Sequence, residues 1–222
     1  MYIQTQSRAF LGTSPDHNDF IFNDHSEEFV YQRNIRDPRF GDVSLLQNRK
    51  NGKIIALEVF NVEDTRELKN QVQEAKEKLA LVNSNLMGLI DCTMKENRKL
   101  CSANYTLKFY YDFPKTDLKK EIQRRKKAEN HFSAKELLFI LKDISEANAY
   151  LQKQGFYHGD LNPLMVAYDN KDKRSKLILT ELLKKDSQLG LQFQKNRILS
   201  GNVLYQSPRL FQIANEIGRA HV

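Results

Sequence analysis

The sequence predicts an α+β protein, in which a small antiparallel β-sheet with one helix is followed by a mainly helical region. Three observations predict this class. Short β-rich runs are concentrated in the first half of the chain, two amphipathic helices carry clear starting signals, and the later helix precedes only short strands. At 222 residues with 40% hydrophobic side chains, the chain is long enough to bury a core and too apolar for a fully disordered protein.

Three short runs of β-branched, aromatic and aliphatic residues begin the predicted sheet, at 29–31, 43–46 and 54–60. Asn51 and Gly52 lie between the second and third runs. An Asn-Gly pair between two apolar runs is a strong short-range signal for a β-hairpin. We therefore expect these two strands to pair in antiparallel fashion.

Two helices are predicted from capping signals and apolar spacing. Asp64 with Glu67 three residues later indicates a helix start, and Ser133 with Glu136 forms a capping box. Gly155 is expected to end the second helix. The apolar residues that recur at helical spacing are Leu68, Val72, Ala75, Leu79 and Val82 in the first helix, and Leu137, Leu141, Ile144, Ala147 and Leu151 in the second.

Further strands are expected on either side of the second helix. Residues 86–90 and 105–113 precede it, and residues 164–168 and 176–180 follow it, joined by a polar turn at 169–175. The resulting order is that of a small sheet lobe followed by a helical lobe.

The charge balance is basic, with 35 Lys and Arg against 28 Asp and Glu and a formal net charge of +7. The densest basic run, 119–127, lacks the interleaved aromatic residues and the recognition motif of nucleic-acid-binding segments. We interpret it as a solvated helical face, and nucleic acid is disfavoured as a partner.

The sequence also bears on cellular location. No apolar run approaches the roughly 20 residues that a membrane-spanning helix needs, and the N-terminus lacks the apolar core of a secretory signal. Cys92 and Cys101 are too few for a disulfide framework or a four-ligand zinc site. We therefore expect a cytoplasmic or nuclear protein without a membrane span.

An ordered set of short motifs resembles the protein kinases. Residues 156–163 (FYHGDLNP) are similar to the catalytic loop H-R-D-L-x-x-x-N, and residues 201–209 (GNVLYQSPR) to G-T-x-x-Y-x-A-P-E. Earlier in the chain, residues 40–43 (FGDV) resemble the end of the glycine-rich loop, 55–58 (IALE) the V-A-I-K strand, and 110–114 (YYDFP) the hinge. The resemblance implies a bilobal kinase-like fold over about residues 29–216.

The resemblance divides the chain into four parts. It implies a polar extension at 1–27, a kinase-like N-lobe at 28–114, and a partial C-lobe at 115–216 that ends after the activation segment. Residues 217–222 (IGRAHV) resemble the translation of a sequencing-library adaptor, so we expect the genuine sequence to continue differently after about Glu216. A natural short C-terminus is the alternative.

The same resemblance implies a set of site positions, several of which carry unsuitable residues. Asp160 stands at the catalytic-base position, but Met165 replaces the magnesium-binding Asn and Glu181 replaces the Asp of D-F-G. A thioether is a poor ligand for a hard cation, whereas weak metal binding by Glu181 stays open. No metal is assigned. The implied nucleotide-pocket positions are Phe40, Gly41, Val43, Ala56, Glu58, Glu74, Tyr111 and Phe113.

Glu58 is the most consequential departure, because it occupies the position of the phosphate-binding lysine. The resemblance makes Glu74 its partner, so two carboxylates would face each other. We expect either that the helix swings outward or that Lys76 or Lys78 intervenes; alternatively, Glu74 simply faces solvent. The loop at 36–43 retains only Gly41 of three glycines and should bind phosphate poorly.

These departures favour a pseudokinase that regulates or scaffolds a protein partner, with no cofactor assigned. The alternative is a divergent active serine/threonine kinase that transfers the γ-phosphate of ATP to protein with Mg²⁺. A third interpretation is an unrelated α/β binding domain whose basic run engages nucleic acid or an acidic membrane surface.

Overall fold

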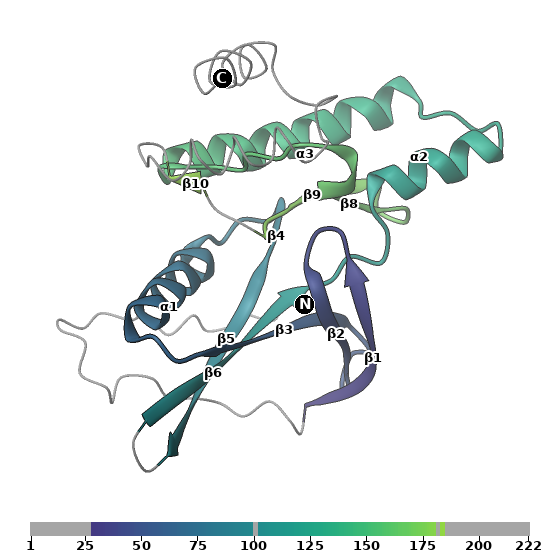
Figure 1. Ribbon diagram of the computed structural model, residues 1–222. Helices are drawn as coiled ribbons and strands as arrows, with labels where there is room; N and C mark the ends of the chain where they lie inside the picture. The colour runs from purple at the N-terminus through teal and green to yellow at the C-terminus, as the bar shows by residue number, and fades with distance from the viewer. Residues whose placement is uncertain (1–27, 100–101, 181–182, 185–222) are drawn as a thin grey trace, which may run out of the picture.

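The computed structural model describes residues 28–99, 102–180 and 183–184. The predicted extension at 1–27 and the C-terminal residues 217–222 lie outside these ranges. Within them the protein is mixed α+β, as predicted, with a five-stranded antiparallel sheet and three α-helices (Figure 1).

The five-stranded sheet has the order β1-β2-β3-β6-β5, and every neighbouring pair is antiparallel. Alternation along β3 turns Ala56 and Glu58 toward one face and Ile55 and Leu57 toward the other. The sequence indicated the first three strands but missed most of β5, which is rich in charged and polar residues. The strands are β1 (Phe29–Asp37), β2 (Gly41–Asn48), β3 (Ile54–Val62), β5 (Leu89–Lys99) and β6 (Ser102–Asp112).

Two tight turns join the first three strands, and each uses a glycine with a positive φ. Gly52 has φ +68° and donates its backbone N–H to the Asn48 carbonyl at 2.9 Å, so the predicted Asn-Gly hairpin is confirmed. Gly41 has φ +75° at the start of β2. A side chain is disfavoured in this left-handed region, which accounts for a glycine at this position.

Helix α1 (Thr65–Ala80) crosses beside β5 on one face of the sheet (Figure 1). Its predicted start is confirmed, because the Asp64 carboxylate accepts a hydrogen bond from the backbone N–H of Arg66 at 2.7 Å. Leu68 and Ala75 are buried as expected, but Val82 lies beyond the helix and is 71% exposed. The apolar series predicted from the sequence therefore extends one member, Val82, beyond the end of the helix.

Helices α2 (Leu118–Lys127) and α3 (Ala134–Lys153) follow the sheet. The predicted capping box at the start of α3 is confirmed, and Gly155 follows the helix end with φ +81°. The predicted apolar face of α3 is only half correct: Ala147 and Leu151 are fully buried, whereas Leu137 and Leu141 are exposed. The C-terminal half of the helix is the part that packs on β9 and β7.

Short strands complete the second half of the described chain. A three-stranded sheet has the order β4-β9-β8, and β10 pairs with β7. The run predicted at 86–90 divides at Gly88, where an added Cβ would lie 3.2 Å from the Leu179 carbonyl oxygen. Glycine thus permits the close approach of β4 to the segment after β9. These strands are β4 (Leu86–Met87), β7 (Phe156–Tyr157), β8 (Val166–Asp169), β9 (Arg174–Ile178) and β10 (Leu183–Lys184).

The main core lies between α1, the inner face of the sheet and the β8–β9 strands. Its buried members include Leu107, Phe109 and Ile178, from elements distant in sequence. A second cluster, containing Leu151 and Leu177, lies beneath α3. Among the described residues, no helix is both long and apolar enough to span a bilayer.

Candidate functional site

The implied nucleotide-pocket positions come together at the inner face of the sheet. Ala56 on β3 is directly opposite Tyr111 on β6, and Val43 on β2 belongs to the same cluster. All three are buried, with Ala56 fully so. Phe40 closes this cluster, because its ring centroid lies 5.6 Å from that of Tyr111 and 5.7 Å from that of Phe113. The side chains expected to line an open pocket therefore contact one another.

The turn between β1 and β2 is fixed over this cluster by a buried arginine. Arg39 donates from Nε and Nη2 to the two carboxylate oxygens of Asp37 at 2.8 and 2.7 Å. Its Nη1 lies 3.8 Å from Oδ2 of Asp117, which caps α2. The guanidinium also lies 5.4 Å from the Phe40 ring centroid and 5.3 Å from that of Phe113. The turn is thus joined to the start of α2 across the edge of the cluster.

The contact with Arg39 lowers the pKa of the Asp37 carboxyl. Burial raises the pKa of its carboxyl, but hydrogen bonds from the side chain and backbone of Arg39 outweigh burial, so the pKa lies below its usual value. A charged Asp37 keeps the pair intact near neutral pH. The burial of Arg39 could not be predicted from the sequence, because its partners include residues more than seventy positions away.

The acidic side of the cluster contains Glu58 and Glu74. Glu58 is half-buried on the same strand face as Ala56. Lys78 is 5% exposed and forms an ion pair with Glu74 at 2.8 Å, and its Nζ lies 5.8 Å from the Tyr111 ring centroid. Of the two lysines expected to intervene, Lys78 is therefore the one turned inward. Its charge is balanced by Glu74, whose side chain remains 42% exposed.

The segment around Asp160 is held by a small hydrogen-bond network. Asn162 donates from Nδ2 to the Asp160 carboxylate at 3.0 Å and to its backbone carbonyl at 3.1 Å. The Asp160 N–H donates to His158 Nδ1 at 3.3 Å, which leaves Nε2 to donate to the Ile178 carbonyl at 2.8 Å. The loop is therefore tied to the end of β9. Asn162 is not among the site residues predicted from the sequence, although its place before a proline indicates a side-chain turn.

Met165 and Glu181 stand at the two positions where the resemblance implies a replaced metal ligand, and only Met165 is among the described residues. Met165 is buried in the main core with Ala167 and Ile178, so its thioether packs against apolar side chains. Glu181 lies outside the described residues. In the part of the chain that the structure describes, no cluster of three or more His, Cys, Asp or Glu side chains could hold a metal ion.

A second charged network, centred on Arg125, lies between α2 and α3. Arg125 donates to Glu121 at 2.7 Å and to Glu136 at 2.8 Å, and its guanidinium lies 3.8 Å from the Phe132 ring centroid. Glu121 also accepts from Arg124 and from Asn170. Glu121 and Arg125 are buried, so the interpretation of 119–127 as a wholly solvated helical face is wrong for these two positions.

This network lowers the pKa values of two acidic side chains, Glu121 and Glu136. The hydrogen bond from Arg124, followed by those from Asn170 and Arg125, lowers the pKa of Glu121 to about 2 against the opposing effect of burial. The hydrogen bond from Arg125 likewise lowers the pKa of Glu136. Both carboxylates are therefore charged at neutral pH, and each is committed to a partner inside the protein.

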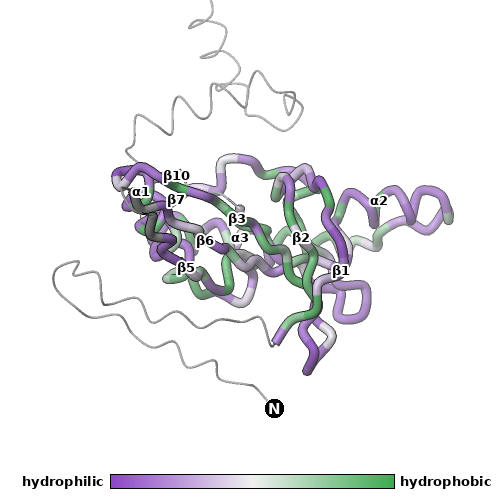
Figure 2. Tube along the Cα trace, turned by 60° about the horizontal axis from the view of Figure 1, so that its bottom comes forward, coloured by the Kyte–Doolittle hydropathy of each residue, from purple (hydrophilic) through white to green (hydrophobic). Residues whose placement is uncertain are grey.

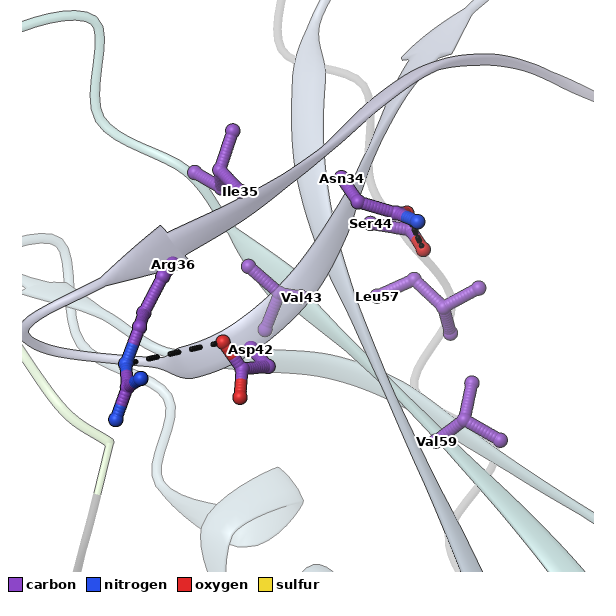
Figure 3. Close-up of a pocket in the computed structure, with 8 residues that line it drawn as sticks. All are labelled: Asn34, Ile35, Arg36, Asp42, Val43, Ser44, Leu57 and Val59. Carbon is purple, nitrogen blue, oxygen red and sulfur yellow. Dashed lines mark hydrogen bonds and ion pairs between the residues drawn. The ribbon is translucent and has the colours of Figure 1, made fainter.

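A shallow hollow of about 520 Å³ lies on the opposite side of the first strands (Figure 3). Ser44 donates to Asn34 at 2.8 Å within it, and Arg36 lies 3.9 Å from Asp42 at its rim. Both members of that ion pair are more than 80% exposed. Leu57 and Val59 form its apolar side. Of the implied site positions, only Val43 lines this hollow, and Asp160 does not.

Comparison with models of known protein families gives no match for this chain, and comparison with curated proteins gives none either.

Proposed function

We propose that the chain is a bilobal kinase-like module with a closed nucleotide site, and that it acts on a protein partner as a regulator or scaffold. The order of its elements supports this proposal: a five-stranded sheet with one helix, then two helices, then a loop containing Asp160 between short strands. The resemblance of residues 156–163 to the kinase catalytic loop also supports it.

The packing of Phe40 is the single observation that carries the proposal. Its buried ring packs against both Tyr111 and Phe113, with centroid distances of 5.6 and 5.7 Å, and Ala56 in the same cluster has no exposed surface. A nucleotide base would have to displace this ring from the core. Losing the packing of a buried Phe typically costs about 3–5 kcal/mol, which would weaken nucleotide binding by orders of magnitude.

The charges around this cluster argue in the same direction. Phosphoryl transfer depends on positioning and on neutralising phosphate charge with a lysine and bound magnesium. Here Glu58 stands where a cation would be needed, Lys78 is neutralised by Glu74, and Met165 is a core residue. Because charge stabilisation is often the largest catalytic contribution, an isolated Asp160 gives little rate enhancement.

A divergent active kinase is the second candidate, and one arrangement favours it. Asp160 is held in place by Asn162, and the buried Lys78 lies beside Tyr111 at the implied pocket. If the Phe40 ring moved aside, Lys78 would become the nearest candidate for contacting phosphate. Lys78→Met separates this candidate from the first, since only an active enzyme would lose phosphate transfer on that change.

The experiment compares purified full-length chain with Asp160→Asn, in thermal-shift and phosphate-transfer assays with ATP and Mg²⁺. We expect no change in melting temperature at millimolar ATP and no transferred phosphate. Asp172→Asn, an exposed aspartate in the β8–β9 turn, is the matched control. Phosphate transfer that persists in the control and disappears in Asp160→Asn would refute the closed-site proposal.

A further inference from the structure

Helix α2 has an outward face with an unusual distribution of charge. Between Lys115 and Lys127 every exposed charged side chain is basic, while Asp117 and Glu121 are both buried. Figure 2 shows this helix as a mainly hydrophilic element at the edge of the described structure. The exposed basic side chains are Lys115, Lys119, Lys120, Arg124, Lys126 and Lys127.

The acidic residues of this region do not neutralise that face. Glu121 is 1% exposed and accepts hydrogen bonds from Arg124, Arg125 and Asn170. Asp117 caps the helix and contacts Arg39 and Lys120. Among the described residues, no ion pair engages Lys119, Lys126 or Lys127. Both acidic side chains of this segment are therefore paired within the protein, and Lys119, Lys126 and Lys127 remain available to another molecule.

Helix stability alone does not explain this distribution. Basic side chains in the last turn interact favourably with the helix dipole, which accounts for Lys126 and Lys127. Lys119 and Lys120 stand in the first turn, where the same dipole disfavours a cation. Like charges four residues apart, such as Lys120 and Arg124, repel each other as well. The ion pair with Asp117 at 3.5 Å offsets this cost for Lys120, whereas Lys119 has no ion pair among the described residues.

We infer that this outward face of α2 is a docking surface for an acidic segment of a partner protein. Charge complementarity selects the acidic partner, and Ile122, which is 43% exposed at one flank of the face, provides an apolar contact within it. The buried network beneath the helix holds the surface in place before binding, since Arg125 joins α2 to Glu136 on α3. Preorganisation of this kind reduces the entropy lost on association.

A protein segment fits this surface better than a nucleic acid. The planar guanidinium forks that suit phosphate are already engaged, because Arg124 is bound to Glu121 and Arg125 is buried. Between 118 and 127 no aromatic side chain is available for base stacking. The remaining donors are lysine ammonium groups around an isoleucine.

The inference depends on the protein-binding role proposed above, but it does not depend on the closed nucleotide site. The test uses the full chain and a fluorescent peptide of alternating Glu and Leu residues at physiological ionic strength. We expect measurable binding that Lys119→Glu, Lys126→Glu and Lys127→Glu together weaken by about tenfold. The matched control reverses the same number of exposed lysines elsewhere, at Lys50, Lys69 and Lys176, and should change affinity by less than about twofold.

Two additional arms keep the result interpretable. Replacing the three α2 lysines by Gln guards against loss of folding and should weaken binding in the same direction, with an unchanged circular dichroism spectrum. Ile122→Ser should weaken binding of the Glu-Leu peptide but leave that of an all-Glu peptide unchanged. Equal losses in the α2 and control variants would overturn the inference, as would tighter binding of single-stranded RNA of matched charge. Phosphate transfer by the chain would refute the closed nucleotide site but would not contradict the docking surface on α2.

Discussion

Two buried arginines lie in the two regions for which roles are proposed, and their surroundings differ. Arg125 joins two carboxylates, the Tyr168 hydroxyl and the face of Phe132 beneath α2. Arg39 joins Asp37 to Asp117 beside the aromatic cluster, but its Nη1 and the Asp117 Oδ2 have no hydrogen-bond partner among the described residues. One network is well satisfied and supports the proposed docking face. The other is partly satisfied and holds the turn over the cluster.

The difference between the two networks shows what determines the contribution of a buried charge to the free energy of unfolding. A buried ion pair contributes little when compared with apolar packing, but removing one member leaves the others desolvated without compensation. The loss should therefore scale with how many groups depend on the missing side chain. Replacing each arginine by Met, which keeps much of its volume, tests this directly.

The largest effect is expected for Arg125→Met. Glu121 and Glu136 would lose their shared cation, and Tyr168 and Phe132 would lose a contact each, so we expect a loss of about 3 kcal/mol in the free energy of unfolding. Urea denaturation followed by circular dichroism measures it. Arg124→Met is the control, because its side chain is 58% exposed; a loss as large in the control would contradict the explanation.

The sequence could predict elements that depend on neighbouring residues. The capping box of Ser133 and Glu136, the Asn51-Gly52 hairpin and the Asp64 cap were all correct, because each requires contacts within four residues. Strand β5 was largely missed because its pairing with β6 stabilises a polar segment. Local preference is a weak guide where tertiary pairing decides the structure.

The candidate site was predictable only in its list of positions. Motif order named Phe40, Ala56 and Tyr111, and the fold brings these three together. Sequence reasoning could not determine that they contact each other, since that depends on how far the β1–β2 turn descends onto the sheet. The burial of Arg39, which fixes that turn, follows from its contact with Asp117 on a distant segment.

A smaller effect is expected for Arg39→Met. Among the described residues, the Arg39 side chain donates hydrogen bonds only to Asp37, whereas Arg125 donates to Glu121, Glu136 and Tyr168, so fewer hydrogen bonds are lost at Arg39. We expect a loss of about 1.5 kcal/mol in the free energy of unfolding, measured in the same urea titrations. If this loss equalled or exceeded that of Arg125→Met, the contrast between the two networks would fail.

The acid limb of the stability profile should depend on the α2 network. The folded-state pKa of Glu121 is about 2, below its ordinary value near 4.5, so its contribution is complete above about pH 4.5 and is lost as the pH falls toward 2. We expect the urea midpoint to fall over that window, and Glu121→Gln to make the decline shallower. The readout is the slope against pH, which a general loss of stability would not alter. An unchanged slope in Glu121→Gln would assign the acid sensitivity to other carboxylates.

The smallest effect is expected for Arg36→Met, three residues before Arg39 in the same turn region. Arg36 lies 3.9 Å from Asp42, and the two side chains are 88% and 82% exposed, so water screens their attraction and both lose rotamer freedom in pairing. We expect the free energy of unfolding to change by less than about 0.5 kcal/mol, with no dependence on added salt. A larger loss would mean that the rim of the Figure 3 hollow stabilises the turn, and that exposure does not separate Arg36 from Arg39. Because both arginines carry the same charge and stand close together in sequence, burial is the property that this last comparison isolates.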